Sequence, residues 1–146
     1  MFGVLKNHSL PKEPALMNEI VLAYVGDCVY ELYVRNLSVE TGEPKVYKLD
    51  KMSSQRSKAS YQAAAIKKIL PELSEKEEGV VRRARNKKIT SKPKNATPMD
   101  YKAATSFEAL VGYLYLTGQH ERMEYIIGIA LGEYESEKND SNINEE

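Results

Sequence analysis

The stretch EIVLAYVGDCVYELYV, residues 19–34, is apolar almost throughout and carries one aspartate, Asp27, near its middle. A segment that is apolar on nearly every side predicts a buried helix, here over about residues 14–38 with Pro14 in its first turn. An ionised carboxylate is rarely buried without a partner, because its desolvation costs on the order of several kcal/mol. The stretch therefore predicts a central, buried helix and a special role for Asp27.

The rest of the chain continues the helical pattern. Its 146 residues, 42% of them apolar, suit one domain with one core. No alternating pattern bounded by turn residues marks a strand, so we expect an all-α fold. Further helices are predicted near 46–70, 74–86, 101–118 and 119–137, the first of them broken or re-capped at Ser53 and Ser54. The domain should span 14–137, between a polar lead-in at 1–13 and an acidic, disordered tail at 138–146.

Composition argues against several classes of protein. No window holds 18 consecutive apolar residues, so a membrane span is not expected. Residues 1–14 lack the apolar run and cleavage site of a signal peptide. Cys28 is the only cysteine, which rules out an intrachain disulfide or a thiolate metal cluster, and we expect it to be a small buried residue. The simplest interpretation is a cytoplasmic protein.

The formal net charge is zero, but the charges are segregated along the chain. Residues 45–94 hold 15 Lys and Arg against 5 Asp and Glu, and the remainder carries the balancing negative charge. Segregation of this kind is typical of a polyanion-binding face on an otherwise acidic protein. The alternative is that basic surface helices merely adjoin.

A second apolar helix repeats the pattern of the first. The stretch TSFEALVGYLYLTG, residues 105–118, holds one acid, Glu108, with Gly112 one turn later, and Gly26 directly precedes Asp27 in the first helix. An interior glycine costs about 1 kcal/mol relative to alanine, so it usually marks a close backbone approach. Two helices that cross at these glycines would bring the two carboxylates together.

Two facing carboxylates repel each other unless one is protonated or a cation lies between them. An all-oxygen site favours Mg²⁺, or Mn²⁺ in its place, and such an ion supports phosphodiester hydrolysis. The alternative is structural, with Asp27 paired to Arg35 or to a tyrosine hydroxyl. Glu31, one turn after Asp27, either adds an outer contact to the ion or forms a plain salt bridge.

Two segments resemble the catalytic motifs of a known family. LAYVGDCVYELYV (22–34) resembles the signature helix of ribonuclease III domains, and TSFEALVGYLYLTG resembles the second catalytic helix of that family. RRARN (82–86) and the lysine-rich loop after it are similar to the Mini-ribonuclease III subfamily, which lacks a double-stranded-RNA-binding domain. The resemblance covers about residues 14–132, and the remaining length leaves no room for such a domain. It implies a single ribonuclease III-type helical endonuclease domain.

The resemblance implies that Asp27 and Glu108 are both catalytic residues and metal ligands, for Mg²⁺ or Mn²⁺. Larger members of the family carry further acids where this chain has Ile20, Ala23 and Thr105. The carboxylate count is therefore two, and the number of ions per site stays open.

The resemblance also implies an assembly and a substrate. The expected enzyme is a homodimeric endoribonuclease whose two sites each cut one strand of an RNA duplex, leaving 5′-phosphate and 3′-hydroxyl ends. The expected substrate is structured precursor RNA, in particular the precursor of large-subunit (23S) ribosomal RNA. The main alternative is a catalytically inactive RNA-binding or ribosome-assembly protein. A helical protein-interaction module that never meets RNA is a third reading.

A protein that binds an RNA duplex needs basic side chains more than base-reading ones, because A-form RNA is recognised mainly through its phosphates and 2′-hydroxyls. Without an appended RNA-binding domain, affinity should be modest and steeply salt-dependent. The predicted RNA-binding residues are Arg82, Arg83, Arg85, Asn86, Lys87, Lys88, Lys92 and Lys94, with a second group of Lys51, Arg56 and Lys58.

Overall fold

A computed structural model describes residues 9–88 and 94–133 of the chain. The described residues form six α-helices and two short 3-10 turns, with no strand among them, which confirms the all-α prediction. The tail expected at 138–146 lies outside the described residues. The helices are α1 (Glu19–Glu40), α2 (Val46–Ser57), α3 (Ala59–Ile69), α4 (Glu75–Arg85), α5 (Pro98–Leu116) and α6 (His120–Ala130), and the turns are Pro14–Leu16 and Leu70–Glu72.

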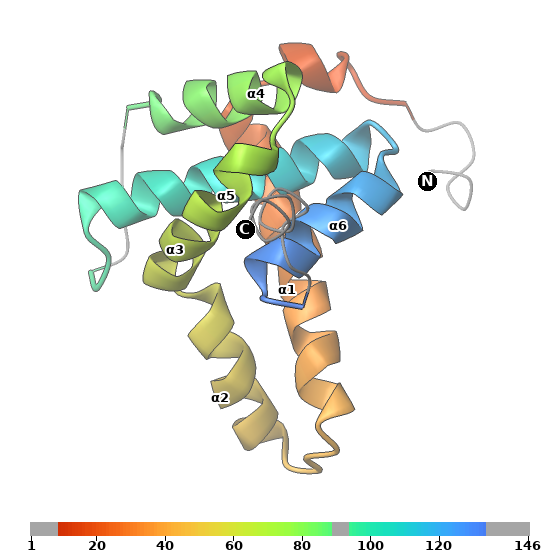
Figure 1. Cartoon of the computed structure of the whole chain (residues 1–146), viewed down its shortest axis with the longest axis vertical. Coiled ribbons are helices and arrows are strands. Elements are labelled where there is room, and N and C mark those ends of the chain that lie inside the picture. The colour runs from red at the N-terminus through yellow and green to blue at the C-terminus, as the bar shows by residue number, and fades with distance from the viewer. Residues whose placement is uncertain (1–8, 89–93, 134–146) are drawn as a thin grey trace, which may run out of the picture.

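Helix α5, and not the first helix, occupies the centre of the fold. It packs against α1, α3, α4 and α6, and its contact with α1 is the most extensive in the molecule. Phe107, Leu110 and Leu114 of α5 are fully buried. Figure 1 shows α5 running across the molecule behind α3, while the lower half of α1 runs beside α2.

The prediction that α1 is buried on nearly every side is wrong. One face, which includes Leu22, Tyr30 and Val34, packs into the core. The opposite face is open, with Tyr24 82% exposed and Leu32 60% exposed. Composition could not separate these two faces, because both are apolar.

Several helix boundaries differ from the predicted ones, each for a local reason. Asn18 caps α1, its Oδ1 accepting a hydrogen bond from the backbone N–H of Ile20, so the helix starts later than expected. The break between α2 and α3 falls at Lys58, whereas Ser53 lies buried inside α2. Gly132 has a φ of 75°, a left-handed conformation that follows the end of α6. This helix is therefore shorter than the predicted 119–137.

The start of α4 is closed by a capping box. The Ser74 hydroxyl accepts from the backbone N–H of Glu77, and the Glu77 carboxylate accepts from the backbone N–H of Ser74. Arg122 of α6 donates to the same carboxylate and, at 2.6 Å, to the backbone carbonyl of Glu72. Buried Glu77 therefore fastens α4 to α6.

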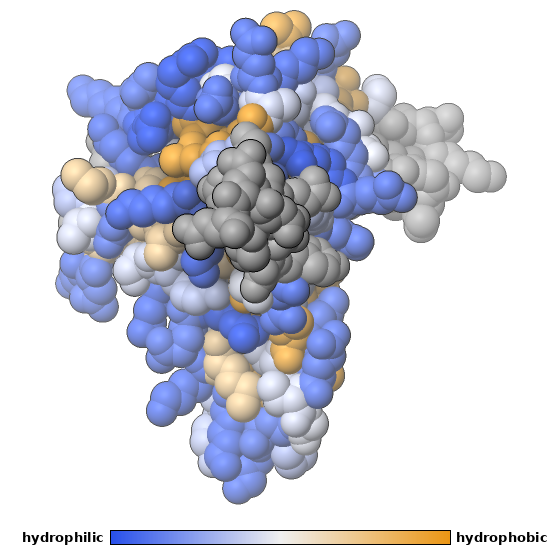
Figure 2. All heavy atoms as spheres, in the orientation of Figure 1, coloured by the Kyte–Doolittle hydropathy of each residue, from blue (hydrophilic) through white to orange (hydrophobic). Residues whose placement is uncertain are grey.

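One face of the domain is largely polar. On the face drawn in Figure 2, hydrophilic residues predominate over α4 and over the lower end formed by α1 and α2. Among the described residues, no helix combines the length and the apolar content needed to cross a bilayer.

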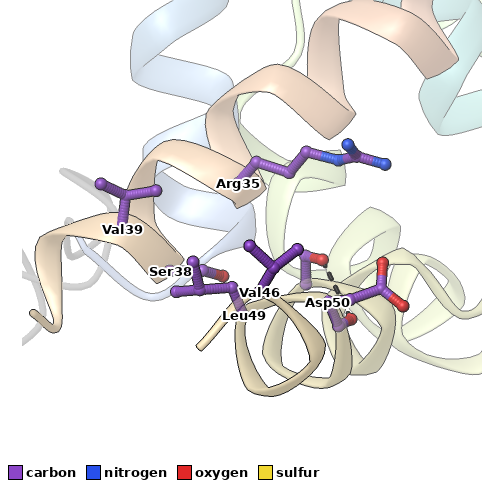
Figure 3. A pocket seen from close by; sticks show the side chains of 7 residues that line it. Arg35, Ser38, Val39, Val46, Leu49 and Asp50 are labelled. Atoms are coloured by element: carbon purple, nitrogen blue, oxygen red, sulfur yellow. Dashed lines mark hydrogen bonds between the residues drawn. The ribbon is translucent and has the colours of Figure 1, made fainter. Parts of the chain in front are cut away.

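A small pocket of about 150 Å³ opens between α1 and α2 (Figure 3). Val39, Val46 and Leu49 supply its apolar wall, and Ser53 donates a hydrogen bond to the backbone carbonyl of Asp50 beside it. Neither of the predicted catalytic acids lines this pocket.

Candidate active site

Helices α1 and α5 cross at Gly26 and Gly112, with backbone against backbone. A Cβ atom added to Gly26 would lie 1.7 Å from the carbonyl oxygen of Glu108, and one added to Gly112 would lie 1.9 Å from the carbonyl oxygen of Leu22. No side chain fits at either position. The glycine crossing predicted from the sequence is therefore present, and it sets the residue after Gly26, which is Asp27, beside the backbone of Glu108.

The two acids also interact electrostatically. Burial raises the pKa of the Glu108 carboxyl to about 8, and the negative charge of Asp27 adds to this rise. Burial likewise raises the pKa of Asp27, with a smaller contribution from Glu31. The structure thus brings the two predicted carboxylates together.

The position of Asp27 differs from the prediction. It was expected to be buried, but Asp27 is exposed, and so is its neighbour Cys28, which we also expected in the core. Both line an open depression on the outer face of α1, together with Tyr24 and, from α5, Tyr115. Glu108 is the more enclosed of the two acids. The site therefore has one carboxylate at its floor and one that solvent reaches.

The alternative pairings of Asp27 are not found in the described structure. Arg35 pairs with Glu31, its Nε lying 2.9 Å from Oε1, and the Ser57 hydroxyl donates to the other oxygen of Glu31 at 2.5 Å. Of the two roles proposed for Glu31, the plain salt bridge is the one observed.

The donor set at the crossing fits Mg²⁺ or Mn²⁺. Within the described residues, no group of three or more His, Cys, Asp or Glu side chains could hold a metal ion, so a site at this crossing would have to rest on two carboxylates. Mg²⁺ commonly binds through one or two carboxylates and keeps several waters. A hard ion of this kind would also relieve the repulsion that raises the pKa of Glu108.

The predicted RNA-binding residues have different environments. Arg82, Arg85, Asn86 and Lys88 at the end of α4 are exposed, as are Lys94, Lys51 and Lys58, whereas Arg56 is half-buried. Lys92 lies outside the described residues.

Arg83 and Lys87 form ion pairs with the chain's own Glu19. This carboxylate, buried at the start of α1, lies 3.0 Å from Arg83 Nε and 3.2 Å from Lys87 Nζ. The pKa of Glu19 is lowered, because hydrogen bonds from its backbone and from the two cations outweigh the effect of burial. Both cations stay partly exposed, and they hold the end of α4 against the start of α1.

Sequence reasoning missed Gln62. This residue of α3 is 1% exposed, and its side chain hydrogen-bonds Glu108. Ile66 and Ile69 follow Gln62 by four and seven residues, so the amide of Gln62 lies on the same apolar face of the helix. A buried amide at helical spacing was the available signal.

Comparison with known proteins identifies the family of the chain. Residues 20–119 match the sequence profile of the Ribonuclease III domain, a span that includes both acids and both crossing glycines. Together, the helical fold and the acid pair define a ribonuclease III domain. "Mini-ribonuclease 3" of Symbiobacterium thermophilum is 44% identical over 117 residues, covering 80% of this chain and 90% of that protein. The protein of the same name in a Thermoanaerobacter species is 42% identical over 133 residues, covering 90% and 94%.

A solved structure supports the same assignment. The crystal structure of a Fusobacterium nucleatum protein superposes with a TM-score of 0.75 at 33% identity, covering 84% of this chain and 99% of that one. The chain belongs to the Mini-ribonuclease 3 family of endoribonucleases. Members of the wider ribonuclease III family generally use divalent metal ions and act on structured RNA, typically as dimers.

Proposed function

We propose that this protein is a metal-dependent endoribonuclease that cleaves double-stranded or structured precursor RNA, with Asp27 and Glu108 as its metal ligands and catalytic residues. The observation that carries the proposal is the glycine crossing, which sets a half-buried Glu108 against the charge of an accessible Asp27. Among the described residues neither acid has a cationic partner, so a ligand-binding role explains the pair better than a structural one.

Each acid has a distinct part in this proposal. When bound, Mg²⁺ or Mn²⁺ supplies a polarised phosphate oxygen and an activated water for hydrolysis. Glu108 holds its side of the site from within the helix crossing, where its backbone is in contact with Gly26. Asp27 lies on the open face, where a phosphate of the substrate can approach it.

RNA phosphates would be bound by the basic end of α4. Arg82, Arg85 and Lys88 are exposed there, and Lys94 follows at the other side of the loop. Arg83 and Lys87 belong to the same surface, but phosphates must compete with Glu19 for them. Lys51, Arg56 and Lys58 form the second proposed contact. We expect the salt dependence of binding to reflect the exposed cations more than the two that Glu19 already neutralises.

The open face of α1 would be covered by a second copy of the chain. Val21, Tyr24, Leu32 and Val39 project from it at helical spacing, with exposures of 49% to 82%. Large apolar side chains gathered on one face mark a protein interface more often than a solvated surface. A dimer formed here would enclose Asp27 and would provide two sites, one for each strand of a duplex. Its products would carry 5′-phosphate and 3′-hydroxyl ends.

The proposed physiological substrate is the precursor of large-subunit (23S) ribosomal RNA. The test is cleavage of a precursor stem by the purified protein, with Mg²⁺ or with chelator, beside Asp27→Asn and Glu108→Gln. Glu121→Gln, a change at an exposed acid of α6, is the matched control. We expect cleavage with Mg²⁺ in the wild type and the control only. Equal RNA binding by all variants without any metal-dependent cleavage would instead support the inactive RNA-binding alternative.

A further inference from the structure

Gln62 presents a polar group where the core should be apolar. It lies on α3, which packs against α5, and only 1% of its surface is exposed. Its carbonyl oxygen Oε1 has no hydrogen-bond partner among the described residues. Buried polar atoms are nearly always paired, because an unmet one costs about 1–3 kcal/mol. The amide therefore calls for an explanation beyond packing.

The explanation lies next to Gln62, at Glu108. The Gln62 side chain lies within hydrogen-bonding reach of the Glu108 carboxyl, and an ionised carboxylate there can accept only from the amide Nε2. The two ends of an amide share one carbon atom, so Oε1 lies close to the same carboxyl group. The unpartnered oxygen thus sits beside the site where the two acids meet.

We propose that Gln62 is a positioning residue for the metal-binding site, with Nε2 holding the Glu108 carboxylate and Oε1 accepting a hydrogen bond from a water on the divalent ion. This inference rests on the proposed function. An ion bound by two carboxylates keeps several waters, whose protons need acceptors. Groups that orient ligands in this way change metal affinity by about 10- to 100-fold when they are removed. The amide supplies one such acceptor without adding a third negative charge.

The test measures metal binding without RNA. Mn²⁺ affinity is determined by calorimetry for the wild type, for Gln62→Met, which keeps a similar volume, and for Gln55→Met, a control at an exposed glutamine of α2. Thermal unfolding in chelator is measured alongside. We expect Gln62→Met to bind Mn²⁺ about 10- to 100-fold more weakly while its metal-free stability stays equal or rises, because a buried polar atom without a partner has been removed. Gln55→Met should leave both quantities unchanged.

A purely structural role for Gln62 predicts the reverse pattern. In that case Gln62→Met would lower the unfolding temperature in chelator, and its folded fraction would bind Mn²⁺ as the wild type does. That result would overturn the proposal. If Gln62→Met does not fold, Gln62→Asn replaces it: the amide remains polar but falls one methylene short, so the same loss of Mn²⁺ affinity is expected.

Glu108→Gln separates this inference from the proposed function. If Glu108→Gln binds Mn²⁺ as tightly as the wild type, the proposed metal site is wrong. If Glu108→Gln loses binding and Gln62→Met does not, only the role of Gln62 is wrong.

Discussion

Replacing Gly26 by alanine should break the helix crossing that builds the site. The new Cβ would lie 1.7 Å from the carbonyl oxygen of Glu108 and 2.8 Å from the amide nitrogen of Gly112. Both are backbone atoms of a central helix, which cannot rotate away as a side chain can. Restoring an ordinary contact requires α1 and α5 to separate by roughly 1.5 Å in a close-packed core.

The expected cost is large compared with the stability of a domain of this size. Overpacking a core typically costs about 1–3 kcal/mol, and a clash between two backbones should reach or exceed the upper figure. A loss of about 3 kcal/mol would lower the melting temperature by roughly 10 °C. The same separation would move Glu108 away from Asp27, and a displacement of about 1 Å at a catalytic site can cost on the order of 100-fold in rate.

Urea unfolding followed by far-UV circular dichroism gives the stability, and RNA cleavage at a temperature where the variant is folded gives the activity. Gly79→Ala is the matched control: Gly79 is also buried in a helix, but its Cβ would meet only Arg83 Nη1, at 3.0 Å, the end of a flexible side chain. This control should match the wild type or gain up to about 1 kcal/mol of helix propensity. A Gly26→Ala protein within about 1 kcal/mol of the wild type would refute the argument.

Four further predictions concern the Glu77 ion pair, the titration of Glu77 and of Glu108, and the open face of α1. Arg122→Met should lower the free energy of unfolding by about 2 kcal/mol, because the buried carboxylate of Glu77 would lose its cationic partner. Urea unfolding should show this loss, and an unchanged midpoint would contradict the prediction. The pKa of Glu77 is lowered in the fold, so its contribution to stability should be lost as the pH falls. The contribution of Glu108 to stability depends on pH in the opposite direction when chelator keeps metal away. Its folded pKa of about 8 exceeds its ordinary 4.5, so the metal-free protein should lose about 2 kcal/mol of stability as the pH rises from 6 to 9. Glu108→Gln should flatten that dependence in unfolding titrations, and an equally steep curve for this variant would rule out Glu108 as its source. Leu32→Arg should shift the protein from dimer to monomer in light scattering with its helix content intact, and an unchanged mass would place the interface elsewhere.

The crossing of the two acid-bearing helices could be predicted because its signals are local. Each of the two helices carries one acid beside an interior glycine, and an interior glycine has few explanations other than close approach. The exposure of Asp27 could not be predicted in the same way. Periodicity shows that a face is apolar, but it does not show whether the chain's own residues or those of another chain cover it.

Ion pairs between residues far apart in the chain could not be predicted from the sequence, for a different reason. Glu19 meets Arg83 across 64 positions of the chain, and no pattern within either helix indicates that contact. Helical position alone therefore could not show that two of the basic residues at the end of α4, Arg83 and Lys87, are held by a buried acid. The buried amide of Gln62 did leave a local signal, an uncharged polar residue on a face shared with Ile66 and Ile69.

The open face of α1 has a practical consequence for dilute samples. Every newly made chain first exists alone, with Tyr24, Leu32 and their neighbours in water and Asp27 among them. If a second copy covers this face, association and the enclosure of the catalytic acid are the same event, governed by mass action. Activity per chain should then fall on dilution. At low concentration, single chains would adsorb to surfaces or aggregate through this apolar face of α1. At higher concentration, the same face would pair with a second copy and complete the proposed active site.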